Sequence, residues 1–173
     1  QAVSHLNLDQ YPDQTSSNFN ALNYGNDVYF RTAALFKYAE DYAGTASFDR
    51  AMHKYFEEWK FRHPYPEDLR ETFNRQVNRP MSWLFDILGS SGKSDYAVRR
   101  VRKEGEGKFE VTLSNQGTIA APVSLSGMSG DSMVYNSWLD GFSGSRTVIV
   151  EQKGIDRFVI DKDGRYYDYN LKD

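Results

Sequence analysis

The stretch GSSGKSD, residues 89–95, separates two halves of the sequence that have different hydrophobic periods. Before it, apolar residues recur every three or four positions, a spacing typical of amphipathic helices. After it, apolar and polar residues alternate, which is typical of strands. The stretch itself consists mostly of small residues, and this composition predicts a linker. We therefore expect an α+β chain with two domains, residues 1–92 and residues 93–173.

The most strongly periodic helix is expected in SFDRAMHKYFEEWKF, residues 47–61, and Pro64 should end it. Its apolar side chains fall at i, i+3, i+4, i+7, i+8 and i+11, which predicts one buried face made of Phe48, Ala51, Met52, Tyr55, Phe56 and Trp59. An earlier helix should run from about Val28, with Asn26 or Asp27 as its N-cap and Gly44 as its C-terminal stop. Its apolar positions Val28, Leu35, Tyr38 and Tyr42 fall close to one stripe.

Two further helices are expected before the linker, and a loop before the first helix. Pro66 suits the first turn of one of them, because its missing N–H is not needed there. The apolar positions of these two helices are Leu69, Phe73 and Val77 in one, and Trp83, Leu84, Ile87 and Leu88 in the other. Residues 1–25 are polar and rich in turn formers, so we expect an extended lead-in loop.

The second half predicts an all-β sandwich of the immunoglobulin-like kind. KFEVTLSNQG, residues 108–117, alternates apolar and polar side chains and ends in a turn. Further strands are expected at 121–125, 133–139, 146–151 and 157–161, and a hairpin through Asp163 and Gly164 to 166–169. Short strands at this spacing are typical of a sandwich. The expected core residues are Val111, Leu113, Val123, Leu125, Val148 and Ile160.

The composition argues against nucleic acid and membrane partners. The 173 residues carry a formal net charge of -3, which gives no long-range attraction for phosphates. One basic run, residues 99–103, fits the solvated face of a strand better than a binding site. No window approaches 18 consecutive apolar residues, so we expect no membrane contact from this segment.

No metal centre is expected in this chain. There are no cysteines, and the three histidines His5, His53 and His63 do not form the HExxH pattern of a zinc helix. His53 and Glu57 stand one helical turn apart, but two ligands on a solvated face usually bind nothing. With so few histidines, no base is evident for a serine nucleophile either.

The first helix and the turn before it contain Tyr24, Tyr29, Tyr38 and Tyr42. Most tyrosines on an amphipathic helix are packing residues whose hydroxyl reaches water. Spacing alone therefore gives none of these four a chemical role.

A resemblance to a known family adds to this interpretation. The segment VYFRTAALFKYAEDYAGTASFDRAMHKYFEEWKFRHPYPEDLRETF, residues 28–73, resembles the segment that follows the zinc site in aminopeptidase-N-type metallopeptidases, the gluzincin aminopeptidases. The family pattern Tyr-x-Lys-Gly/x-Ala falls on residues 29–33, with Arg31 in place of the customary lysine. Later parts of the family are similar to three further segments, MSWLFDILGSSGKSDYAV, VTLSNQGTIAAPVSL and IDRFVIDKDGRYYDYN. The ordered matches therefore run from about residue 23 to residue 170.

The resemblance implies that the first domain is the C-terminal helical part of a thermolysin-like catalytic domain. It implies that Tyr29 is catalytic and donates a hydrogen bond to the oxyanion formed from the peptide substrate. Tyr24 would line the substrate cleft. Zinc, its ligands and the general base would belong to an N-terminal part of the same polypeptide, so this chain alone would be inactive. Bacterial relatives of similar domain make-up imply an extracytoplasmic, periplasmic or secreted, location.

Two alternatives to an enzyme fragment remain open at this point. The chain could be a non-catalytic module, helices plus a sandwich, that descends from the same family and binds a protein or a glycan. It could also be an unrelated structural domain, which requires the order of the motifs to be coincidental.

Overall fold

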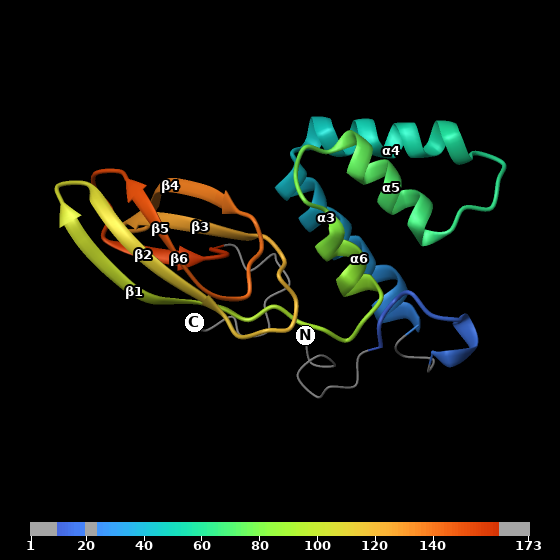
Figure 1. The fold of residues 1–173 in the computed structure, drawn as a ribbon, viewed down its shortest axis with the longest axis horizontal. Helices are drawn as coiled ribbons and strands as arrows, with labels where there is room; N and C mark the ends of the chain where they lie inside the picture. The colour runs from blue at the N-terminus through green and yellow to red at the C-terminus, as the bar shows by residue number, and fades with distance from the viewer. Residues whose placement is uncertain (1–9, 20–23, 163–173) are drawn as a thin grey trace. The chain divides into compact units, whose positions relative to one another are not determined.

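A computed structural model describes residues 10–19 and 24–162, and the chain divides into two compact units, Gln1–Ser91 and Gly92–Asp173 (Figure 1). The described part of the first unit is helical, and its elements are η1 Ser16–Asn18, η2 Tyr24–Arg31, α3 Thr32–Ala43, α4 Thr45–Trp59, α5 Pro66–Gln76 and α6 Ser82–Leu88. The second unit contains the strands β1 Tyr96–Gly105, β2 Lys108–Asn115, β3 Val123–Ser129, β4 Ser132–Leu139, β5 Gly144–Glu151 and β6 Arg157–Ile160. The predicted α+β class is confirmed.

The core of the helical unit is built around one face of α3. Of the expected stripe, Leu35, Tyr38 and Tyr42 are buried, and Val28, which belongs to η2, is partly buried. The ring of Trp83, from α6, lies 4.5 Å from the Tyr38 ring and 6.2 Å from the Tyr42 ring, measured between centroids. Gly44 ends α3 at a φ of 82°, a backbone angle that favours glycine because a side chain is strained there.

The predicted buried face of α4 is only partly covered. α4 packs against α3 and α5 (Figure 1). Of its apolar stripe only Ala51 is buried, and the Phe56 side chain is 65% exposed. The prediction that the whole stripe is buried was therefore wrong, because the described neighbours cover a narrower band than the stripe. The helix also ends at Trp59, well before Pro64, and Phe61 then adopts a left-handed φ of 64°.

Helical structure begins earlier than the sequence predicts. Tyr24, expected in a loop, is the first residue of η2, a π-helix that continues directly into α3. Neither expected N-cap position starts this helix. Asp27 lies inside η2, and its carboxylate accepts a hydrogen bond from the Gln10 backbone N–H at 2.8 Å. A bond to a distant part of the chain cannot be read from local spacing.

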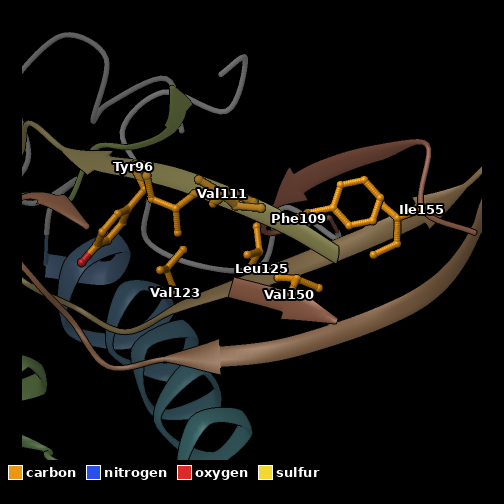
Figure 2. Close-up of a cluster of buried hydrophobic side chains, with 9 residues drawn as sticks. Tyr96, Phe109, Val111, Val123, Leu125, Val150 and Ile155 are labelled. Carbon is orange, nitrogen blue, oxygen red and sulfur yellow. The ribbon is translucent and has the colours of Figure 1, made fainter. Parts of the chain in front are cut away.

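The second unit is a small sandwich of two antiparallel sheets, with strand orders β1-β2-β5 and β4-β3-β6. Both sheets contribute to one buried cluster (Figure 2), whose members are Tyr96, Phe109, Val111, Leu113, Val123, Leu125, Val150, Ile155 and Ile160. Five of the six predicted core residues belong to it, and Val148 packs against it while partly buried. The predicted hairpin to residues 166–169 lies outside the described residues.

Two local features tie the ends of this sandwich together. The buried Tyr96 hydroxyl donates to the Ala121 carbonyl at 2.6 Å and lies 3.3 Å from the Phe142 N–H, which donates to it. Gly141 passes so close to Ala120 that an added Cβ would collide with the Ala120 carbonyl oxygen. The basic run of residues 99–103 lies on β1 with exposed side chains, as expected of a solvated strand face.

Candidate functional site

The tyrosines of the first helical segment divide into buried and exposed ones. The Tyr38 and Tyr42 side chains are 4% and 2% exposed, in the core of the helical unit. Tyr29 is 61% exposed, and Tyr24 is 40% exposed. Tyr38 and Tyr42 are packing residues, whereas the Tyr29 side chain can reach a ligand.

Tyr24 and Tyr29 form a contacting pair on η2. Their ring centroids are 5.9 Å apart and the ring planes meet at 76°, an edge-to-face arrangement. The Tyr24 ring makes a second edge-to-face contact with Phe19, at 5.8 Å and 83°. Tyr24 is therefore held between two aromatic rings, and Tyr29 lies at the open end of this row.

The pKa of Tyr24 is raised above the ordinary tyrosine value. The largest cause is a side-chain hydrogen bond with Tyr29, followed by the charge that Tyr29 would carry and by burial. The neighbouring Tyr29 side chain is therefore the main cause of the raised pKa.

A buried polar clamp fixes the opposite face of η2. The Asp27 carboxylate, fully buried, accepts from the Gln10 backbone N–H at 2.8 Å. The Arg31 guanidinium donates from Nη1 to the Gln10 carbonyl oxygen at 3.1 Å, and its side chain is only 9% exposed. Arg31, which stands where the family has lysine, thus binds the lead-in segment. The sequence gives no signal for this clamp, since its two ends are 17 and 21 residues apart.

The described residues do not provide a zinc site. Within residues 10–19 and 24–162, no three histidine, aspartate or glutamate side chains converge on a point where a metal could bind. His53 and Glu57 are both exposed on α4, and His5 lies outside the described residues. Among the described helices, none combines the length and hydrophobicity needed to cross a bilayer.

The helical unit also has an apolar pocket of about 380 Å³, lined by Pro12, Asp13, Val28, Thr32, Tyr55, Pro64, Tyr65, Pro66, Leu69, Arg70, Phe85 and Leu88. Tyr24 and Tyr29 do not line it. The Arg70 guanidinium carbon lies 5.0 Å from the centroid of the Phe85 ring, a cation–π contact. The pKa of Tyr55 is raised, mainly because the side chain is partly buried and secondarily because of the charge of Asp68. The exposed tyrosine pair and this pocket are separate features.

Comparison with known proteins gives a structural likeness and no sequence match. No known family and no curated protein matches this sequence. Among solved structures, the chain is similar to part of Legionella pneumophila aminopeptidase A in complex with aspartic acid. The TM-score is 0.70 at 15% identity, and the likeness covers 92% of this chain and 19% of that chain. At this identity it shows the fold alone, and the chain spans about a fifth of the length of that protein.

Proposed function

We propose that this chain is the part of a zinc-dependent aminopeptidase that supplies the oxyanion-stabilising tyrosine, Tyr29. Such an enzyme hydrolyses the first peptide bond at the N-terminus of a peptide. The observation that carries the proposal is the position of Tyr29, which is exposed on η2 and falls in the family's tyrosine motif. The likeness of the fold to part of an aminopeptidase supports it.

The proposed chemistry needs only a neutral phenolic donor. When water adds to a peptide carbonyl, the carbonyl oxygen becomes an oxyanion and gains negative charge. A phenolic hydroxyl keeps its proton at neutral pH and can donate to this oxygen. A donor held in place before the reaction lowers the barrier because it stabilises charge that is present only in the transition state.

The zinc ligands would lie outside this chain. Because the described residues do not fit a metal, we propose that an N-terminal part of the same polypeptide holds the zinc and supplies the general base. The chain by itself would then be inactive towards peptides. The peptide substrate and the N-terminal part of the same polypeptide would be the two partners of this chain.

The test is a set of hydrolysis assays on the full-length polypeptide that contains this chain. Peptides with a free N-terminus should lose one residue at a time, and the same peptides with an acetylated N-terminus should stay intact. A chelator should abolish the activity and added zinc should restore it. A full-length protein that holds zinc but cleaves neither peptide would refute the proposal.

A non-catalytic binding module is the second candidate, and the exposed aromatic surface of the helical unit favours it. Phe30 is 75% exposed, Phe56 is 65% exposed and Phe61 is fully exposed. Exposed apolar side chains can mark surfaces that other proteins cover. This candidate predicts a full-length protein without zinc and without peptidase activity.

A further inference from the structure

The buried polar clamp joins η2 to a single residue of the lead-in segment by two hydrogen bonds. The Asp27 carboxylate accepts from the Gln10 backbone N–H at 2.8 Å, and the Arg31 Nη1 donates to the Gln10 carbonyl oxygen at 3.1 Å. One bond would leave η2 free to turn about the point of attachment, whereas two bonds to the same residue restrict that rotation. Asp27 is fully buried and Arg31 is 9% exposed, so little water competes with either bond.

The clamp lies on the face of η2 opposite to Tyr29. Asp27 and Arg31 each stand two residues from Tyr29 in the sequence, one before it and one after it. Two residues make about half a turn of a helix of either pitch, so the side chains at both positions point away from the one between them. The observed exposures agree, since Tyr29 is 61% exposed and both clamp residues are buried. The direction of the Tyr29 side chain therefore depends on the rotation that the clamp restricts.

Gln10 is itself held in place by further hydrogen bonds of the lead-in segment. Its side chain donates from Nε2 to the Asn18 carbonyl oxygen at 2.7 Å. The Asp13 backbone N–H donates to the carbonyl oxygen of Leu88, the last residue of α6, at 2.9 Å. Residues 10–18 are thus bonded to each other and to α6, so Gln10 gives η2 a fixed point of attachment.

Resting on the proposed function, we propose that Asp27 and Arg31 are positioning residues for Tyr29: by binding both backbone groups of Gln10, they hold η2 at the rotation that presents the Tyr29 hydroxyl to the substrate oxyanion. An oxyanion donor is effective when it is in place before the reaction, and a misplacement of about 1 Å can lower a rate about 100-fold. Because Tyr29 is largely exposed, its own packing constrains it weakly, and its placement depends on the backbone beneath it.

The first experiment tests the clamp in the 173-residue protein and needs no activity. Hydrogen exchange of the Gln10 amide is followed by NMR in the wild type, in Arg31→Met and in the control Lys37→Met, which removes an exposed positive charge from α3. The wild-type amide should exchange at least about 10-fold more slowly than an unprotected one, because a buried carboxylate binds it. Arg31→Met should speed this exchange by roughly 3- to 10-fold, since the loss of one bond loosens the other, and Lys37→Met should not. An unprotected wild-type amide, or equal rates in all three proteins, would overturn the two-point clamp.

The second experiment measures the steady-state kinetics of the full-length protein loaded with zinc. Arg31→Met should lower kcat by roughly 10- to 100-fold with KM within about 2-fold of the wild type, because the oxyanion donor is displaced while substrate binding is kept. Arg31→Lys keeps the charge and a donor, so it should retain more of kcat than Arg31→Met. Lys37→Met should keep kcat within about 2-fold of the wild type. An unchanged kcat in folded Arg31→Met would overturn the positioning role.

A double variant shows whether the clamp acts through Tyr29. In Tyr29→Phe the donor is already lost, so adding Arg31→Met should lower kcat by no more than about 2-fold further. A merely structural role would give the same loss of kcat with and without the Tyr29 hydroxyl. That result would overturn the positioning role.

If Arg31→Met fails to fold, Gln10→Pro removes the other attachment, because proline has no backbone N–H for Asp27 to bind. Its reference is Gln10→Ala, which has lost the same side chain but keeps both backbone groups. The kcat of Gln10→Pro should be about 10-fold below that of Gln10→Ala, and equal values would overturn the positioning role. A wild-type protein that cleaves no peptide would end the proposed function and the positioning role together, and the exchange of the Gln10 amide would still decide whether the clamp exists. If the wild type is active and Tyr29→Phe lowers kcat but Arg31→Met does not, the positioning role alone fails.

Discussion

Replacement of Tyr29 by phenylalanine in the full-length protein tests whether Tyr29 is a catalytic residue or a packing residue. The change removes one oxygen from a side chain that is 61% exposed and keeps the edge-to-face ring contact with Tyr24 at 5.9 Å. The free energy of unfolding should therefore change by no more than about 0.5 kcal/mol, as for most surface substitutions. Loss of an oxyanion donor typically costs about 2.7–4 kcal/mol of transition-state stabilisation, so kcat should fall about 100- to 1000-fold.

The assay is steady-state hydrolysis of a peptide with a free N-terminus, together with thermal unfolding and zinc analysis of each variant. KM should change little, because the donor acts on charge that develops after binding. The control is Tyr42→Phe, whose ring stays buried against Trp83 and under the Arg79 guanidinium, and its turnover should remain within a few-fold of the wild type. A folded, zinc-loaded Tyr29→Phe enzyme with unchanged kcat would refute the reasoning.

Three further outcomes are expected of the 173-residue chain. After dialysis, elemental analysis should find no stoichiometric zinc, since a catalytic site needs three protein ligands and the described residues bring no three together. Tyr96→Phe should lower the free energy of unfolding of the sandwich by about 1–3 kcal/mol in denaturant titrations, because the Ala121 carbonyl loses its donor in a buried place. Phe73→Ala, in the core, should cost about 3–5 kcal/mol, whereas Phe56→Ala on the exposed edge of α4 should change stability by about 0.5 kcal/mol or less; equal losses would contradict the observed burial.

The sequence predicts those features that depend on local periodicity. The alternation of Val111 and Leu113 places both in the sandwich core, and the spacing of Leu35, Tyr38 and Tyr42 places all three in the helical core. These predictions succeed because a side chain's direction follows from its position along a regular helix or strand. The α+β class follows from the same two periods.

Periodicity predicts less well where burial depends on the width of the neighbouring elements. The stripe on α4 identifies the helix and its apolar face, but it cannot show that Phe56 stays exposed. The apolar face of a helix is buried only where neighbouring elements are wide enough to cover it, and those elements come from other parts of the chain. The hydrogen bonds that join Asp27 and Arg31 to the Gln10 backbone could not be predicted either. They link residues that are far apart in the sequence, and the local pattern around one residue does not indicate its partner.

The winding of η2 is the feature of the candidate site that spacing misjudges most. Read with a period of 3.6, Tyr24 and Tyr29 belong to different faces, and the neighbours of Tyr29 would be residues three or four positions away. In the π-helix the tyrosine five positions earlier is the neighbour, at 5.9 Å. A change of pitch over eight residues therefore decides which aromatic ring packs against Tyr29.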